Sequence, residues 1–351
     1  MGTYKRAKPF TIDVPQLARK IREGDRGALA KGITLLESVS PTHRPHGEAL
    51  LRELLPYSGG AKRIGITGVP GAGKSTFLEA FGLRLVEKDH RVAVLAVDPT
   101  STRSGGSILG DKTRMELLAH HPNAFIRPSP TGGTLGGVQR RTREVTLLCE
   151  AAGFDVIFVE TVGVGQSEVV ARDLVDVFLY FVLTGAGDEL QGMKKGIMEL
   201  ADVLIVHKAD GENELKAARS KHAFERIVHD IQPVTEGWPP RVMTLSSQTG
   251  MGMEELEQTI DVFFTVTKES GVHEQVRKEQ QRHWFHQALI QRLHDWLNED
   301  AQLRELQTSM QVDVLKKEKT VPEAVDTLFQ AFLQQVHTQI DKSKSHRSRV
   351  E

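Results

Sequence analysis

One stretch of the sequence, residues 68–75, constrains the fold of this chain more than any other. It reads Gly-Val-Pro-Gly-Ala-Gly-Lys-Ser and matches the phosphate-binding pattern G-x-x-x-x-G-K-[ST]. An apolar run at 64–67 precedes it and a helical pattern begins near Lys74, which predicts a strand, a loop and a helix. In such a loop, backbone amides surround the phosphate oxygens. We expect Lys74 to reach the β- and γ-phosphates and the Ser75 hydroxyl to bind magnesium. The alternative is a glycine-rich turn without a ligand, and the strand–loop–helix context favours nucleotide binding over it.

The composition narrows the class of protein. Lysine and arginine number 45 against 46 acidic residues, and the formal net charge of -1 argues against a dedicated nucleic-acid binder. The single cysteine, Cys149, excludes a disulfide framework and a thiolate metal cage, and it suits a reducing compartment. No apolar run reaches the roughly 20 residues that a membrane-spanning helix needs. We therefore expect a cytoplasmic protein that binds neither nucleic acid nor membrane.

Short apolar, β-branched runs alternate with helical patterns in the middle of the chain. These runs lie at 63–67, 92–97, 156–159, 175–183, 203–206 and 242–245. Strands that alternate with crossover helices indicate a mostly parallel sheet with helices on both faces, a fold of the α/β class. The flanking patterns are helical, with two long amphipathic helices predicted at 272–298 and 322–341. We therefore predict an N-terminal helical segment (1–60), a P-loop G domain (61–268) and a C-terminal helical arm (269–351).

Two further strand ends carry residues typical of nucleotide sites. The run at 155–159 ends in Glu160, and Gly163 follows three residues later, as in the Walker B and DxxG arrangement. The acid would hold the metal shell and the Gly163 amide would meet the γ-phosphate. The alternative is a capping acid at a strand end. The run at 203–206 leads into residues 207–210, His-Lys-Ala-Asp, which is an NKxD motif with histidine in place of asparagine.

This last motif is predicted to recognise the base of the nucleotide. The Asp210 carboxylate would accept hydrogen bonds from N1–H and the exocyclic amine of guanine, whereas adenine offers the opposite pattern there. Lys208 would lay its alkyl stem over the base plane. His207 lacks the amide that normally ties this loop to the phosphate loop, although its imidazole can donate one hydrogen bond. The strand end that carries Ser246 and Ser247 lies where a second guanine loop belongs, and together these features favour GTP over ATP.

Two acids between these motifs have more than one interpretation. Asp98 ends the second apolar run and Asp111 follows in a glycine-rich segment. Either carboxylate could approach a metal ion or cap a helix, and the residues alone leave both open. The histidines at 120–121 and 283–286 have no cysteine or carboxylate cluster at ligand spacing, so we interpret them as helix-surface residues.

The stretch 68–191 closely resembles the MeaB/ArgK family of P-loop GTPases, which assist adenosylcobalamin-dependent acyl-CoA mutases. The matching segments are GVPGAGKST, VDPTS, GGSILGDKTRM, ETVGVGQSE and DELQGMKKG. The resemblance implies that the C-terminal helical arm makes a homodimer. It also implies that residues 185–196 form an additional mobile switch between the nucleotide and the mutase.

For the site itself, the resemblance implies that Asp98, Asp111 and Glu160 are acids of the metal shell. It implies that Gln191 and Lys194, within the additional switch, bear on hydrolysis. Without the resemblance, Lys194 would be interpreted as a surface lysine at the start of a helix.

The resulting hypothesis is a homodimeric, Mg²⁺-dependent GTPase that hydrolyses the β–γ bond by direct attack of water. It would act as a chaperone of the mutase (methylmalonyl-CoA mutase or a relative), gating cofactor loading and protecting the enzyme. No glutamine obviously occupies the water-orienting position, although Gln166 lies close in sequence, so we expect slow turnover that rises with a partner. The alternatives are a nickel-inserting metallochaperone GTPase, an ATPase or kinase linked to amino-acid transport, and a scaffold without activity.

The predicted site residues fall into three sets, with Mg²⁺ as cofactor and GTP and GDP as substrate and product. The catalytic set is Lys74, Glu160, Gln191 and Lys194. The nucleotide-binding set is Gly68, Pro70, Gly71, Ala72, Gly73, Lys74, Ser75, Thr76, Gly163, His207, Lys208, Asp210, Ser246 and Ser247. The metal-binding set is Ser75, Asp98, Asp111 and Glu160.

Overall fold

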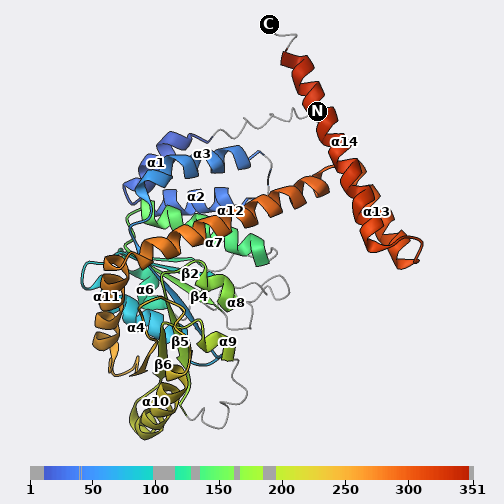
Figure 1. Ribbon diagram of the computed structural model, residues 1–351. Coiled ribbons are helices and arrows are strands. Elements are labelled where there is room, and N and C mark those ends of the chain that lie inside the picture. The colour runs from blue at the N-terminus through green and yellow to red at the C-terminus, as the bar shows by residue number, and fades with distance from the viewer. Residues whose placement is uncertain are drawn as a thin grey trace, which may run out of the picture. The chain divides into compact units, whose positions relative to one another are not determined.

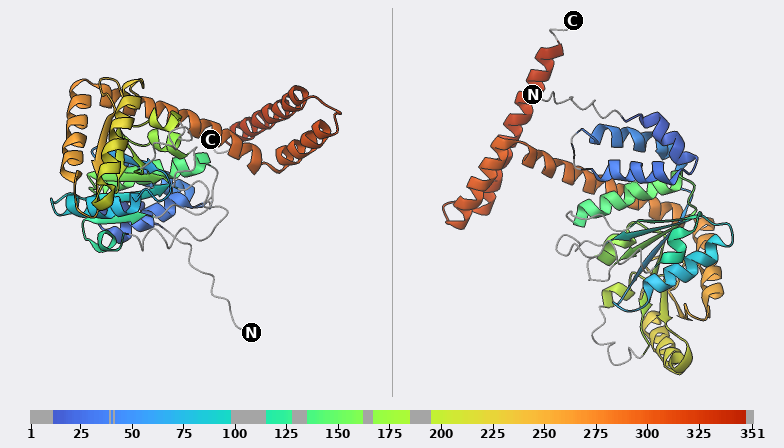
Figure 2. Two further views of the ribbon diagram at one scale, coloured as in Figure 1. Left: turned by 90° about the horizontal axis from the view of Figure 1, so that it is seen from below. Right: turned by 180° about the vertical axis from the view of Figure 1, so that it is seen from behind.

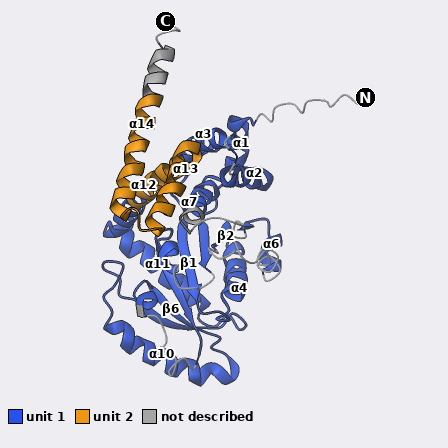
Figure 3. Ribbon diagram, turned by 90° about the vertical axis from the view of Figure 1, so that its right-hand side faces the viewer, with its two compact units in different colours: residues 1–281 blue, residues 282–351 orange. Residues whose placement is uncertain are grey.

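The computed structural model describes residues 12–38, 40, 42–97, 115–127, 135–161, 167–184 and 195–347. The chain divides into two compact units, residues 1–281 and 282–351 (Figure 3). The first unit contains the sheet together with the N-terminal helices, and the second is helical. The domain boundaries at residues 60 and 268 stay predictions.

One parallel sheet of seven strands lies in the described part of the chain, in the order β3-β2-β4-β1-β5-β6-β7 (Figure 1). The strands are β1 (Lys62–Gly68), β2 (Val92–Val97), β3 (Ala124–Arg127), β4 (Val156–Thr161), β5 (Val177–Val182), β6 (Val203–His207) and β7 (Arg241–Leu245). The sequence predicted six of them and missed β3, whose four residues are too few to show a pattern. Most residues of each strand are buried, as in sheets covered on both faces, which confirms the α/β fold class.

Helices cover both faces of the sheet (Figures 1 and 2). The described helices of the first unit include α1 (Val14–Arg22), α2 (Arg26–Glu37), α3 (Arg44–Leu54), α4 (Lys74–Val86), α6 (Glu116–His120), α7 (Leu135–Ala151), α8 (Ser167–Arg172), α9 (Lys195–Met198), α10 (Glu214–His229), α11 (Met253–Glu269) and the start of α12 (Val272–Glu299). Because side chains alternate along a strand, one strand can contribute to two cores, as β4 does with Phe158 and Ile157. Ile66 packs in the cluster that contains Phe81 of α4. Ile157 packs in the cluster that contains Leu148 of α7 and Ile33 of α2.

Buried polar contacts fix the first turns of α12 within the first unit. Arg277 donates hydrogen bonds of 2.8 and 2.7 Å to the Asp176 carboxylate, and the Gln280 amide donates one of 2.7 Å to the Val175 carbonyl oxygen. His273 Nε2 lies 3.4 Å from Asp176. Burial alone would raise the pKa of Asp176, but the contacts with Arg277 and His273 outweigh burial and hold that pKa well below its usual range.

The second unit consists of the end of α12, α13 (Ala301–Leu315) and α14 (Val321–Arg347), and α13 and α14 lie side by side (Figure 2). The sequence predicted two long helices here, at 272–298 and 322–341, and missed α13 between them. The Trp296 ring meets Phe332 edge-on, with 4.7 Å between centroids. Large apolar side chains remain exposed on this unit: Phe285, Leu289, Ile290, Leu293, Val312, Leu315, Val321, Val325 and Phe329. Over the described ranges, no helix combines the length and the apolar character that crossing a membrane requires.

Candidate nucleotide-binding site

The predicted phosphate loop joins the carboxyl end of β1 to the start of α4. Gly73 is the N-cap of α4 and has a φ of 88°, in the left-handed region that favours glycine. A Cβ on Gly68 would lie 2.3 Å from the Phe181 carbonyl oxygen, so no larger residue fits there. The N-terminus of α4 therefore faces the loop, as anion binding requires. The other loop residues differ in exposure, with Ala72 buried, Ser75 half-buried, and Pro70, Gly71 and Thr76 exposed.

The Lys74 side chain folds back over this loop. Its ammonium donates hydrogen bonds to the carbonyl oxygens of Gly68, at 2.8 Å, and Val69, at 3.4 Å. Burial lowers the pKa of Lys74, and the negative charges of Glu160 and Glu168 oppose that shift in part. An ammonium held by carbonyl oxygens can exchange them for phosphate oxygens, which carry more negative charge.

Ser75 and Glu160 meet beside the loop although they belong to different elements. β1 pairs with β4 so that Ile66 lies opposite Glu160, and this register brings the acid to the phosphate loop. The Ser75 hydroxyl donates to a Glu160 oxygen at 3.4 Å, and Glu160 is 9% exposed. A hydroxyl and a carboxylate are hard oxygen donors of the kind that Mg²⁺ prefers, so the donor set fits that ion.

A second contact joins the same two strands and was not foreseen from the sequence. The Thr161 hydroxyl donates to the Thr67 hydroxyl at 2.7 Å, and both side chains are fully buried. This hydrogen bond fixes the end of β4, directly after Glu160, to the end of β1, directly before Gly68. It depends on strand register, and no local motif signals it.

Several predicted site residues cannot be placed by the structure. Asp98, Asp111, Gly163, Gln191 and Lys194 lie outside the described residues. Gln166, the candidate for orienting water, also lies outside the described residues. Their roles stay predictions.

The predicted base loop follows β6 and is held by the turn after β7. Ser246 is fully buried, and its hydroxyl donates a short hydrogen bond to Asp210 Oδ2. The same hydroxyl accepts hydrogen bonds from the backbone amides of Gln248, at 3.2 Å, and Thr249, at 3.3 Å. Lys208 is exposed and has a φ of 58°. The turn after β7 thus orients the carboxylate that is expected to read the base.

His207 lies between the phosphate loop and the base loop. Its Nδ1 is 2.6 Å from the Ala72 carbonyl oxygen, and its Nε2 is 2.7 Å from the Ser247 hydroxyl. The side chain is 2% exposed, and burial lowers its pKa below the usual value. The sequence predicted one hydrogen bond from this imidazole. The structure adds a second contact, with Ser247, because the turn that follows β7 lies beside the end of β6.

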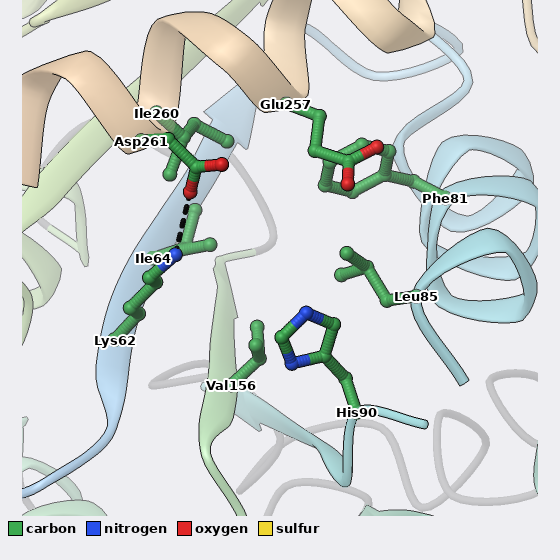
Figure 4. Close-up of a pocket in the computed structure, with 9 residues that line it drawn as sticks. All are labelled: Lys62, Ile64, Phe81, Leu85, His90, Val156, Glu257, Ile260 and Asp261. Carbon is green, nitrogen blue, oxygen red and sulfur yellow. Dashed lines mark hydrogen bonds and ion pairs between the residues drawn. The ribbon is translucent and has the colours of Figure 1, made fainter. Parts of the chain in front are cut away.

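A pocket of about 200 Å³ lies at the opposite, amino-terminal edge of the sheet (Figure 4). Its floor is apolar, and its charged rim residues are already paired. Lys62 donates to Asp261 at 2.6 Å, and Glu257 accepts from Arg84 at 2.9 Å and from Lys88 at 2.5 Å. This pocket is therefore separate from the loops at the carboxyl edge and contains none of the predicted site residues.

The fold and the site define a class of protein. A parallel sheet whose first strand leads through a glycine-rich loop into a helix, with an acid at the end of the neighbouring strand, is the arrangement of a P-loop NTPase.

Comparison with known proteins identifies the family. The chain matches the family described as "Methylmalonyl Co-A mutase-associated GTPase MeaB" over residues 29–302, and it belongs to that family. A probable GTPase of Mycobacterium tuberculosis is 50% identical over 307 residues, which cover 88% of this chain and 91% of that protein. The GTPase ArgK of Escherichia coli is 47% identical over 284 residues, 80% of this chain and 86% of that protein.

A solved structure described as a LAO/AO transport system kinase is 35% identical, with a TM-score of 0.72, and covers 94% of this chain and 100% of its own. These matches confirm the family expected from the sequence and, with it, the expected class of enzyme, a GTPase.

Proposed function

We propose that this chain is a Mg²⁺-dependent GTPase that serves an adenosylcobalamin-dependent acyl-CoA mutase as a chaperone, gating cofactor loading and protecting the mutase. One observation carries the proposal. The phosphate loop, Glu160 and the base loop meet at one edge of the sheet, in a chain whose family is named for association with methylmalonyl-CoA mutase. A cytoplasmic location is part of the proposal, because the single, buried thiol of Cys149 suits a reducing compartment.

In the proposed reaction, water attacks the γ-phosphate directly and GDP leaves. The residues of the chain act by position and charge. The loop amides and the Lys74 ammonium surround the phosphate oxygens and compensate the charge that moves during transfer. Ser75 and Glu160 would hold Mg²⁺, together with Asp98 and Asp111 as the resemblance implies. When bound, that ion neutralises charge on the β- and γ-phosphates.

The base loop supports guanine over adenine. Because Ser246 occupies Oδ2 of Asp210, the carboxylate has a fixed orientation toward the base. Guanine presents two donors to such a carboxylate, N1–H and the exocyclic amine, whereas the N1 of adenine is an acceptor and would be repelled.

The isolated chain is expected to hydrolyse GTP slowly and to accelerate about tenfold or more with its mutase, because a partner that orders a switch completes the catalytic geometry. Phosphate release, measured with and without a purified methylmalonyl-CoA mutase, checks this. An isobutyryl-CoA mutase can be run in parallel to identify the partner.

The control for that measurement is the Lys74→Ala chain mixed with the same mutase, since it reveals any hydrolysis contributed by the mutase preparation. A rate that does not change, with no complex on gel filtration for any of the mutases, would remove the chaperone proposal and leave only the GTPase.

The exposed apolar side chains of the second unit support a homodimer as part of the proposal. Phe285 is 72% exposed on α12, and Leu289 lies one turn further along the same helix. Exposing side chains of this size to water is unfavourable, and burying them between two copies of the chain is favourable. We expect Phe285→Asp combined with Leu289→Glu to convert a dimer to a monomer in light scattering while GTP binding persists. Gln287→Glu on the same helix is the matched control, and a dimer that survives the double substitution contradicts this interface.

A second candidate function has one observation in its favour, the transport-kinase description of the solved relative. A kinase would transfer phosphate to an acceptor and need not select guanine. Tight binding of ADP with weak binding of GDP, measured by calorimetry, would favour that function over the GTPase proposal.

A further inference from the structure

The short helix α8 is held at its end by side chains from two other helices. Arg143 of α7 and Gln280 of α12 donate hydrogen bonds to carbonyl groups there. We propose that Arg143 and Gln280 are positioning residues for recognition of the γ-phosphate, and that they connect α8 to α12. The inference rests on the proposed guanine-nucleotide function and goes beyond it, because it gives two residues outside the predicted nucleotide site a part in that function.

α7, α8 and α12 are joined to one another by hydrogen bonds. The Arg143 guanidinium donates to the carbonyl oxygens of Asp173 and Gln280, both at 2.6 Å. The Gln280 side-chain amide donates to the Val175 carbonyl oxygen at 2.7 Å. The last carbonyl groups of a helix have no partner within the helix, so donors from other elements are needed where α8 ends.

These two side chains are buried. Arg143 is 7% exposed and Gln280 is 9% exposed. Burial lowers the pKa of Arg143 to about 10, so its guanidinium keeps its charge at neutral pH. A positive charge at the C-terminal end of a helix interacts favourably with the carbonyl groups there. Breaking these hydrogen bonds would leave buried carbonyl groups without a donor, which is unfavourable.

The last residue of α8 adds an attachment to the start of β6. The Arg172 guanidinium lies 3.1 Å from the carboxylate of Asp202, which directly precedes β6, and it donates a hydrogen bond of 2.7 Å to the Thr235 hydroxyl. The Asp202 side chain is 1% exposed. The end of α8 is therefore attached to α7, to α12 and to the start of β6.

The other end of α8 is close to the phosphate loop. Residues 162–166 separate α8 from β4, and they include Gly163, the predicted contact of the γ-phosphate. Glu168, in the first turn of α8, is 2% exposed, and its negative charge opposes the lowering of the Lys74 pKa that burial causes. α8 has six residues, so its ends are only about 9 Å apart. Whatever holds the end of so short a helix also restricts its start.

Loss of these attachments should weaken binding of the γ-phosphate in particular. A less restricted α8 has more conformations, and ordering it when the γ-phosphate binds costs more free energy. GDP lacks that phosphate, so its affinity should not depend on α8. Coupling between two sites is reciprocal, so the γ-phosphate should in turn stabilise the first turns of α12.

The first experiment measures the affinities of the full-length chain for GDP and for a non-hydrolysable GTP analogue by calorimetry, at saturating Mg²⁺. Gln280→Met keeps the length of the side chain and removes its N–H donors. We expect this variant to lose about 2- to 10-fold in its preference for the analogue over GDP, and to bind GDP within about twofold of the natural chain. Gln281→Met, at an exposed position beside it, is the matched control and should keep the natural preference.

Hydrogen exchange gives a second readout, which a purely structural role would not change. In the natural chain, the analogue should slow exchange of the amides at 276–281 by about 2- to 10-fold relative to GDP, and in Gln280→Met this difference should vanish. Arg143→Lys keeps the charge but offers one nitrogen in place of two, so it should lose part of the preference for the analogue. Thermal melting of each variant checks the fold.

The proposal is overturned if Gln280→Met keeps the natural preference, or if it weakens binding of GDP and of the analogue equally. Equal exchange in α12 with both nucleotides in the natural chain would overturn it as well. Failure of the proposed function would appear in the natural chain alone, as binding of ADP as tight as that of GDP, and needs no comparison with a variant of Gln280.

Discussion

Replacing Lys74 with alanine is expected to slow GTP hydrolysis by about 10²- to 10³-fold, because it removes the cation that compensates charge on the transferred phosphoryl group. The ammonium is held inside the phosphate loop by the carbonyl oxygens of Gly68 and Val69, which places it where the phosphate oxygens must enter. Release of phosphate from GTP at saturating Mg²⁺ measures the effect.

The fold of the Lys74→Ala chain should survive. Burial lowers the pKa of this lysine, which means that the folded state disfavours its charge, so its removal should not lower the free energy of unfolding. Lys74→Arg is the matched control, since it keeps the charge and changes the shape, and it should also be slow. Hydrolysis at the natural rate in the alanine variant would place the catalytic charge elsewhere.

The second prediction of a large effect concerns the stability of the fold, at a residue outside the predicted nucleotide site. Asp176→Asn is expected to lower the free energy of unfolding by about 3–5 kcal/mol, because the Arg277 side chain, which is only 15% exposed, would keep its charge and lose its carboxylate. Denaturation in urea, followed by circular dichroism, measures the difference. Glu274→Gln on the same helix α12 is the control. Glu274 pairs with Lys278 at 2.7 Å, but its side chain is 74% exposed, and its loss should leave the denaturation midpoint unchanged.

The contribution of Asp176 should also depend on pH in a defined direction. Its pKa in the folded chain lies below that of an unfolded aspartate, which is about 3.9. The unfolded state therefore binds the proton first as the pH falls, and stability is lost in that acid range. The difference between the natural chain and Asp176→Asn should be constant from about pH 5 to 8 and shrink below about pH 4. A difference that grows in acid would show that the aspartate is already protonated at neutral pH.

Local sequence patterns predicted most of the sheet because buried parallel strands are continuous apolar runs. They missed β3, which is short and lies at the edge of the sheet, and α13, which follows α12 after a single residue, Asp300. The phosphate loop was predictable for a related reason: its residues are contiguous, and each performs a role that few other residues could.

The contacts that the sequence did not reveal join residues far apart in the chain. Thr67 meets Thr161 through strand register, and His207 meets Ser247 because β6 and β7 are neighbours. Likewise, Asp176 and Arg277 are separated by 101 positions. No pattern within a window of the sequence contains both members of such a pair, so only the folded chain shows them.

The rate at which Cys149 is alkylated should measure local unfolding of this chain. The thiol is fully buried in the cluster that α7 forms with the N-terminal helices, and burial raises its pKa far above the usual range. Only a thiolate in contact with solvent can attack an alkylating reagent and displace its leaving group, so modification requires that these helices separate. Because the sequence has one cysteine, the alkylation rate reports the opening around Cys149 alone. A cysteine added at the surface would react with a thiol-specific fluorophore long before Cys149 does.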